Sequence, residues 1–231
     1  MKRILLSVLS ALTVFVVSAQ LSPYHEFSVF DGVHYWVEAG ASYGKVTSKN
    51  ADYKIGWRGG VGIDIPFCYS NVSFLPSIMV ENKGYKASNI INSVTKSVEE
   101  TDLASMYVEI PLDFSVNIAI RKKMGIQVYA GPYFGYGVAG KYTVTSDEYL
   151  ALYGKRTIEL KTFEEQGEEY SNVSKQMRKF DFGFDAGLRF IFLRHAMVRV
   201  GCEFGCINAN GVETQPAFRN ITPYASLAFR Y

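Results

Sequence analysis

The sequence is poor in the residue types that most often carry chemistry. It contains three cysteines and three histidines in 231 residues. An odd number of cysteines does not make a disulfide framework. Cys202 and Cys206 would lie about 13 Å apart on one face of a strand, which is too far for a disulfide bond. No Cys or His pair has the spacing of metal ligands. We therefore expect Cys68, Cys202 and Cys206 to be free apolar side chains, and we expect no metal site and no cofactor.

Excess charge and long apolar runs are also lacking. The formal net charge is +2, and removal of Lys2 and Arg3 with a cleaved leader would reduce it to zero. A neutral chain gives no reason to expect nucleic acid as a partner. After the first twenty residues, no apolar stretch approaches the ~18 residues of a membrane-spanning helix.

The first residues have the pattern of a secretory leader. Lys2 and Arg3 precede an apolar run from Ile4 to Val17, and the small residues Ser18 and Ala19 follow it. This pattern predicts a signal peptide over residues 1–19, cleaved after Ala19. An uncleaved membrane anchor is the alternative, although the run is short for a spanning helix of ~20 residues.

Strand patterning is what the sequence has in abundance, together with 20 glycines, 16 tyrosines and 16 phenylalanines. In the last eleven residues, Leu227 and Phe229 alternate with Ser226 and Arg230, and a tilted membrane strand needs about 9–11 residues. The same alternation predicts eight strands: Val33–Tyr43, Lys54–Ile65, Asn71–Asn82, Ser105–Ile118, Gly125–Ala139, Lys179–Ile191, Ala196–Cys206 and Ile221–Tyr231.

Short and long connections alternate strictly between these strands. The short ones are Pro66–Ser70, Ala119–Met124 and Phe192–His195; the long ones are Gly44–Tyr53, Lys83–Ala104, Gly140–Arg178 and Ile207–Asn220. Within two of the long ones, Lys86–Val98 and Arg156–Phe163 could instead extend the sheet above the membrane. This rhythm is typical of outer-membrane barrels, which have tight periplasmic turns and longer outer loops. Aromatic residues at the strand ends fit the two interfacial girdles of such a barrel: Tyr35, Trp57, Phe67, Tyr136, Phe180, Phe192 and Tyr231.

Charge lies on one face of the strands and apolar side chains lie on the other. A soluble barrel or sandwich, which is the alternative fold, would be apolar inside and charged outside; here the long apolar faces suit lipid. We therefore predict an all-β fold, an eight-stranded antiparallel up-and-down transmembrane β-barrel over residues 33–231. Residues 20–32 would form a periplasmic N-terminal segment, with both termini in the periplasm and the barrel in the outer membrane.

The charged face gives the one constellation of candidate site residues. An eight-stranded barrel has an interior just wide enough for side chains, and buried charges must be paired. We therefore interpret the set as a structural ion-pair network in the lumen; a proton path, a channel or an active site is the alternative. Its members are Glu38, Arg58, Asp64, Glu81, Glu109, Asp113, Asp181, Asp185, Arg189, Arg199, Glu203 and Arg230.

Three stretches carry a family resemblance. They are Tyr107–Leu112 (YVEIPL), Val128–Tyr136 (VYAGPYFGY) and Lys179–Gly183 (KFDFG). In their order, the chain resembles the PorT-like outer-membrane β-barrel proteins of Bacteroidetes over Val33–Tyr231. The resemblance implies an eight-stranded outer-membrane barrel and, through the founding member, an association with type IX protein secretion. It supplies no catalytic residues.

A catalytic site for lipid or peptide would need a Ser/His/Asp or similar cluster at the outer rim. His25, His34 and His195 have no such partners at a motif spacing, and His195 falls in a predicted periplasmic turn. We therefore expect no enzyme but a structural or accessory barrel, in protein secretion or surface contacts; a narrow channel is the alternative. Expected partners are outer-membrane lipid, the barrel-assembly machinery, and secretion components or extracellular ligands bound through Gly140–Arg178.

Overall fold

The computed structural model describes residues 29–48, 50–67, 70–92, 97–147, 150, 154–164, 177–210 and 217–231, with the backbone alone over 89–92 and 97–98. The predicted signal peptide and Cys68 lie outside these residues. The strands are β1 (His34–Val46), β2 (Ala51–Pro66), β3 (Val72–Asn92), β4 (Ser97–Arg121), β5 (Met124–Thr145), β6 (Thr157–Lys161), β7 (Phe180–Phe192), β8 (Ala196–Gly205) and β9 (Asn220–Arg230).

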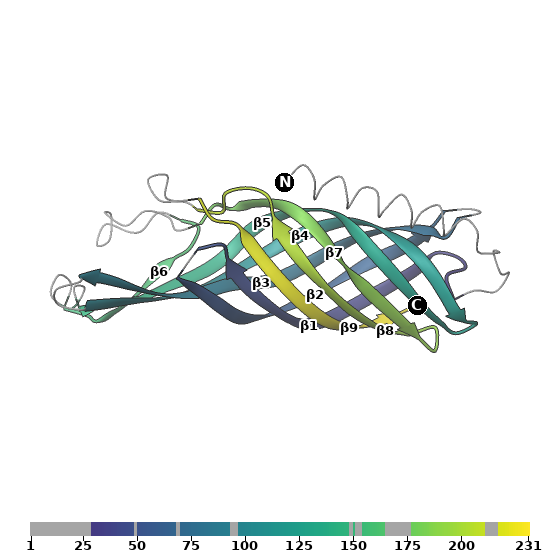
Figure 1. Cartoon of the computed structure of the whole chain (residues 1–231), viewed down its shortest axis with the longest axis horizontal. Helices are drawn as coiled ribbons and strands as arrows, with labels where there is room; N and C mark the ends of the chain where they lie inside the picture. Colours follow the sequence, from purple (N-terminus) through teal and green to yellow (C-terminus); the bar gives the residue numbers. More distant parts are fainter. Residues whose placement is uncertain are drawn as a thin grey trace.

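Eight of these nine strands close into a ring (Figure 1). Each pairs antiparallel with its neighbour along the chain, β5 pairs with β7, and the last strand, β9, pairs with the first, β1. The eight-stranded antiparallel up-and-down barrel predicted from the sequence is confirmed. Closure removes the free sheet edges that an open sheet would expose.

The period of two sorts the side chains between the two faces of the wall. Outward positions are apolar and exposed, such as Val61, Ile110 and Phe184. Inward positions carry mainly polar, charged or glycine residues, together with buried apolar side chains such as Leu75 and Met79. All seven aromatic residues expected in the interfacial girdles are exposed. Lipid provides the apolar environment that these outward side chains need.

Strands β3 and β4 continue well beyond the positions where the sequence pattern placed their ends. β3 and β4 form a hairpin that extends to Asn92 and Ser97, so most of the predicted Lys83–Ala104 loop is sheet. The predicted Gly44–Tyr53 loop is also shorter, since β1 ends at Val46 and β2 starts at Ala51. The predicted loop bounds were wrong at these two places, because hydrogen-bonded pairing persists there; the alternative that the stretch after Lys86 extends the sheet is confirmed.

Toward Thr145, β5 changes its pairing partner, and different positions of the strand face inward. Up to Tyr136 it pairs with β7, and from Lys141 to Thr145 it pairs with the short strand β6. Gly137 pairs with Tyr107 and Ala139 with Met106, so Val138 is an extra residue in the ladder, a β-bulge. After this bulge the even-numbered side chains Tyr142 and Val144 face inward and are buried.

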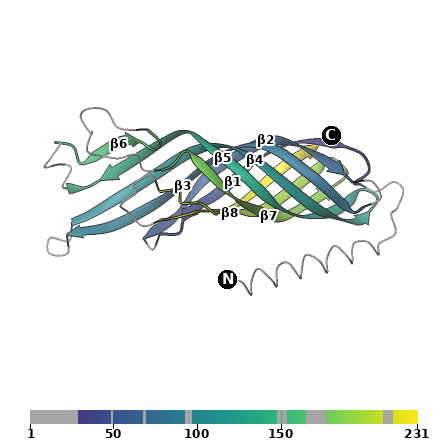
Figure 2. The ribbon, with the colours of Figure 1, turned by 90° about the horizontal axis from the view of Figure 1, so that it is seen from above.

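The two ends of the barrel differ. Strand β6 and the tip of the β3–β4 hairpin lie at one end, called here the β6 end, whereas the C-terminus lies toward the other (Figures 1 and 2). The predicted tight turns are present at this C-terminal end: Lys122 and Lys123 join β4 to β5, and residues 193–195 join β7 to β8. Within the described ranges, no helix is both long and apolar enough to cross a bilayer.

Candidate functional site

All twelve charged residues singled out in the sequence lie inside the barrel, and none is more than 3 % exposed. They come from β1, β2, β3, β4, β7, β8 and β9. The structure adds a thirteenth, Lys83 of β3, which is 2 % exposed. These thirteen side chains are called here the lumen charges. They comprise eight carboxyl groups and five cationic groups, so acids outnumber bases in the described lumen.

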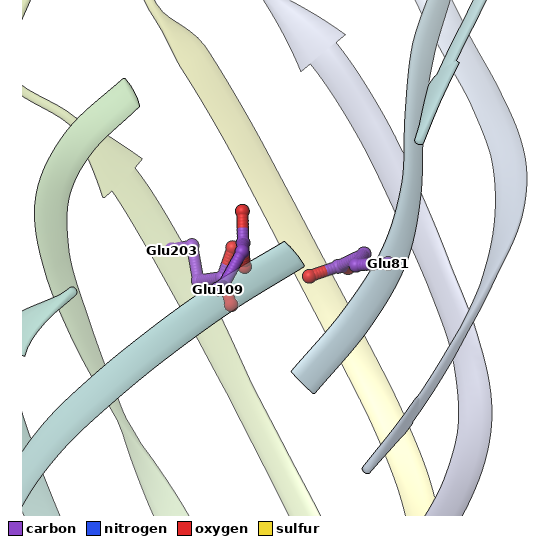
Figure 3. A group of neighbouring side chains, drawn as sticks. All are labelled: Glu81, Glu109 and Glu203. Atoms are coloured by element: carbon purple, nitrogen blue, oxygen red, sulfur yellow. The ribbon is translucent and has the colours of Figure 1, made fainter. Parts of the chain in front are cut away.

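Lys83 is the centre of one group of lumen charges. Its Nζ lies 2.6 Å from Glu109 Oε1, 2.6 Å from Glu203 Oε2 and 3.8 Å from Asp181 Oδ2. The carboxyl group of Glu203 also lies close to that of Glu81. Figure 3 shows the side chains of Glu81, Glu109 and Glu203, which come from β3, β4 and β8. Carboxylate oxygens of these three glutamates lie within 4.8 Å of one another, a spacing that a metal ion could use. The ammonium of Lys83, in contact with two of them, supplies the positive charge instead.

Two arginines hold the middle of the lumen. Arg58 Nε lies 3.4 Å from Glu38 Oε1, its Nη1 lies 3.4 Å from Glu203 Oε1 and 3.8 Å from Glu81 Oε2, and its guanidinium stacks 3.4 Å from the ring centroid of Tyr224. Arg58 therefore connects the Lys83 group to Arg199, because the carboxylate of Glu38 contacts both arginines.

Arg199 is the most fully paired of the lumen charges. Its Nη2 lies 2.8 Å from Asp113 Oδ2 and 2.8 Å from Asp185 Oδ2, and its Nη1 lies 3.5 Å from Glu38 Oε2. Its Nε donates a hydrogen bond of 2.9 Å to the hydroxyl of Tyr129. Charge-assisted bonds of this kind are among the strongest in a low-dielectric interior.

A separate group lies nearer the C-terminal end. Arg230 Nη1 is 3.9 Å from Asp64 Oδ2, and its Nη2 donates to the carbonyl of Val29. Gln127 Nε2 donates to Asp64 Oδ2 at 2.8 Å and to Asn117 Oδ1 at 3.0 Å. The structure thus connects Asp64 and Arg230 to each other but places them apart from the Lys83 group.

Arg189 is the exception among the twelve predicted residues. It is fully buried, but within the described chain its three guanidinium nitrogens have no hydrogen-bond partner and no carboxylate at ion-pair distance. Its guanidinium carbon lies 4.5 Å from the ring centroid of Trp36 and 5.4 Å from that of Tyr129. Cation–π contact with two aromatic rings is therefore the interaction that holds this charge in place.

Apolar clusters close the lumen above and below the charges. At the C-terminal end, Val29 and Phe30, from the segment predicted to be periplasmic, pack inside the ring, where the base cluster consists of Val29, Phe30, Trp36, Met79, Ile191 and Met197. At the β6 end the tip cluster consists of Leu103, Tyr107, Tyr142, Val144, Ile158, Leu160, Phe163, Met177 and Ala209. The charged layer is thus enclosed between two apolar layers.

Lys83 was missed because the predicted third strand stopped at Asn82. The signal was present in the sequence, since Lys83 follows Glu81 at the spacing of two that keeps both on one face of a strand. Four inward-facing tyrosines were also missed as members of this layer. They hydrogen bond to, or stack on, the lumen charges: Tyr107, Tyr129, Tyr133 and Tyr224.

Among the described residues, the remaining histidine and cysteine candidates do not form a cluster that could act as a catalytic site. His195 Nδ1 is 2.9 Å from the carbonyl oxygen of Arg230, and His34 Nε2 is 3.3 Å from Arg230 Nη2, so both are at the C-terminal end. His25 lies outside the described residues. Cys202 and Cys206 are free thiols, as expected.

A closed antiparallel ring with apolar side chains outside and ion pairs inside defines the class of transmembrane β-barrels. The model of the "Outer membrane protein beta-barrel domain" family matches residues 18–208. The chain belongs to this family and is an outer-membrane β-barrel protein.

Solved structures with a similar fold include bacterial outer-membrane proteins. The attachment invasion locus protein Ail of Yersinia pestis is 11 % identical, with 86 % of this chain and 98 % of that chain covered and a TM-score of 0.40. Neisserial surface protein A is 11 % identical, with 87 % and 100 % covered and a TM-score of 0.46. The N-terminal barrel of Pseudomonas aeruginosa OprF is 11 % identical, with 85 % and 97 % covered and a TM-score of 0.33. A search of curated proteins gave no match.

Proposed function

We propose that the protein is a non-enzymatic and non-conducting barrel that carries the β3–β6 sheet on the outer side of the membrane for contacts with other molecules. In this proposal both termini face the periplasm. The observation that carries it is the filled lumen, in which a layer of ion pairs lies between two apolar clusters. A pore would need a continuous polar path, and Leu103, Tyr107 and Phe163 at one end and Phe30 and Trp36 at the other interrupt it.

The sheet at the β6 end is built for stability rather than as a flexible loop. Its inward side chains Leu103, Tyr142 and Leu160 are buried, and Phe163 packs edge-on against Tyr107 with ring centroids 5.3 Å apart. Its opposite face is charged and exposed, with ion pairs such as Lys141–Glu159 at 3.5 Å. A rigid polar face held away from the bilayer suits recognition of a molecule outside the cell.

Conductance and topology test this proposal separately. We expect the purified protein to give no steady conductance in planar bilayers, and a stable open level would contradict the closed lumen. Single cysteines at Thr157 in β6 and at Lys122 in the β4–β5 turn, introduced after Cys68, Cys202 and Cys206 are replaced by serine, report topology. A membrane-impermeant maleimide on intact cells should label the first and not the second, and the reverse pattern would invert the orientation.

Assistance to protein secretion is the second candidate, and it rests on the sequence resemblance to PorT-like proteins. A deletion strain that retains normal export of its secreted proteins would remove this candidate while leaving the surface-contact proposal intact. Loss of export that is restored by the full chain, but not by a chain whose Thr157–Lys161 strand is replaced by Gly and Ser, would link the two proposals.

A further inference from the structure

An apolar groove crosses the outer wall of the barrel toward the C-terminal end. It runs over β9, β1, β2, β3 and β4 and has a volume of about 680 Å³. Its floor consists of Trp36, Gly62 and Ser77. We propose that this feature, called here the wall groove, binds one acyl chain of a phospholipid from the bilayer.

The floor of the wall groove is one row of cross-strand partners. Trp36 pairs with Gly62, and Gly62 pairs with Ser77. A Cβ on Gly62 would lie 2.2 Å from Cζ2 of Trp36, so the indole ring lies directly behind this glycine. Because Gly62 has no side chain, Trp36 is in contact with the groove floor from the lumen side.

Two rows of outward side chains form the sides of the groove. Val37 pairs with Phe229 on β9 and with Val61 on β2, and Val61 pairs in turn with Ile78. These four side chains are apolar and exposed, and they form the side nearer the β6 end. The row that includes Tyr35, two positions away along the strand, forms the other side.

The width of the groove selects its occupant. Two residues along a strand separate the sides by about 7 Å. A helix with its side chains is ~10–12 Å across, and packed sheets lie ~10 Å apart, so neither fits between the sides. An extended hydrocarbon chain does fit, and the surrounding bilayer supplies it.

The groove rises from the rim of the barrel into the apolar band. One end lies beside Phe229, the last residue but one of β9, and beside the exposed Tyr35 near the start of β1. The other end lies beside Ile110, near the middle of β4. Tyrosine rings at the rim of a barrel mark the depth of lipid headgroups. A phospholipid with its headgroup at this rim therefore has its chain directed along the groove.

Prolines interrupt the β-ladder on both sides of β3 beside the groove. Among the described residues, Pro76 has no ladder partner in β2, and Ser77 and Ile78 have none in β4. Pro76 and Pro111 have no N–H to donate, and proline is otherwise confined to edge strands and bulges. The wall is therefore less tightly paired where the groove crosses it.

The floor also carries two polar groups that lack partners. Within the described residues, neither Trp36 Nε1 nor Ser77 Oγ has a hydrogen-bond partner, and both side chains are no more than 4 % exposed. A buried donor without an acceptor is unfavourable. The ester oxygens of a phospholipid are acceptors, and Trp36, near the start of β1, lies at the depth of the ester groups of a lipid whose headgroup is at the rim.

Quenching of tryptophan fluorescence by brominated acyl chains tests the proposal. The chain has two tryptophans, so Trp57→Phe leaves Trp36 as the single reporter. This parent protein is reconstituted in phosphatidylcholine vesicles with or without bromine on the acyl chains. We expect strong quenching of Trp36. Val61→Phe/Ile78→Phe should remove about half of the quenching or more, because the added rings fill the groove.

The matched control is Leu188→Phe/Val200→Phe. Leu188 and Val200 are also outward cross-strand partners, but they lie on β7 and β8, away from the groove. The control should be quenched as strongly as the parent. Equal quenching of the groove-filled variant, or no quenching of the parent, would overturn the proposal. Quenching that falls as the protein-to-lipid ratio rises would assign the groove to a second copy of the chain and would also overturn it.

Native mass spectrometry separates a bound lipid from the surrounding bilayer. On release from detergent micelles, the parent and the control should retain a phospholipid and the groove-filled variant should not; equal retention in all three would contradict the site. Each variant must first show the heat-modifiable gel mobility of a folded barrel. Both measurements use purified protein, so their outcome is independent of the orientation and the surface contacts proposed above.

Discussion

Arg189 of β7 and Arg199 of β8 are direct cross-strand partners in the barrel wall, and within the described chain only Arg199 has carboxylates at ion-pair distance. Two guanidinium groups in register therefore have different roles. Arg199 forms ion pairs with Asp113, Asp185 and Glu38, whereas Arg189 is held by the rings of Trp36 and Tyr129.

Removal of these two arginines should have unequal effects on stability. Arg199→Met leaves buried carboxylates without a partner, and we expect a loss of about 3–5 kcal/mol in the free energy of unfolding. Arg189→Met removes cation–π contacts and should cost about 2 kcal/mol or less. Urea unfolding in phospholipid vesicles, followed by the mobility of unboiled samples on gels, measures both. Equal losses would show that the ion pairs of Arg199 do not determine its contribution.

Lys83 should matter more than any single glutamate around it. Because acids outnumber bases in the lumen, Lys83→Met leaves Glu109 without its cation and Glu203 with Arg58 alone, and we expect about 3–5 kcal/mol of destabilisation. Glu81→Gln removes one of the surplus carboxylates and should cost much less. The same unfolding assay compares the two variants, and a larger loss for the glutamine substitution would contradict this charge balance.

Gly201 keeps space for two tyrosines inside the barrel. A Cβ at this position would lie 2.5 Å from the hydroxyl oxygen of Tyr129 and 2.6 Å from that of Tyr224. Gly201→Ala should therefore destabilise the barrel by about 1–3 kcal/mol, the range for an overpacked interior. Gly59→Ala is the control, since the nearest atom to its added Cβ is the backbone oxygen of Glu38 at 3.3 Å. Similar losses in the two variants would mean that backbone effects dominate.

The end of β9 should be indispensable for assembly. Residues 225–230 pair with β1 on one side and with β8 on the other, so they close the ring. Deletion of Ala225–Tyr231 would leave open edges on both neighbours, which lipid cannot satisfy. We expect no folded protein in the outer-membrane fraction. Normal levels of the truncated chain, measured by fractionation and immunoblotting, would show that another strand can close the barrel.

Much of the fold could be predicted because a membrane barrel makes the strand period visible. Outward side chains must be apolar and inward ones need not be, so Val61 and Arg58 on one strand report opposite faces. The charge on Arg230 marked the lumen face of the last strand in the same way. Alternation of this kind requires no knowledge of which strands are neighbours.

The rest depends on contacts that the period of two does not encode. The bulge at Val138 shifts the inward positions of β5 from odd to even, and a single extra residue leaves little trace in the sequence. The pairing of β5 with β6 depends on distances between segments far apart along the chain. The same is true of the carboxylates, which lie near Arg199 and not near Arg189. For the same reason the burial of Val29 and Phe30 in the barrel mouth could not be predicted.

The continuous course of β3, β4 and β5 from the barrel wall into the sheet at the β6 end has a mechanical consequence. These strands are 21, 25 and 22 residues long, and their backbone hydrogen bonds run across the direction of the barrel axis. A pull on the tip of the hairpin would load this ladder in shear, with many rungs sharing the force at once. The sheet should therefore be stiff along the strands, and a molecule bound to it would transmit a pulling force to the barrel in the bilayer with little extension of the sheet.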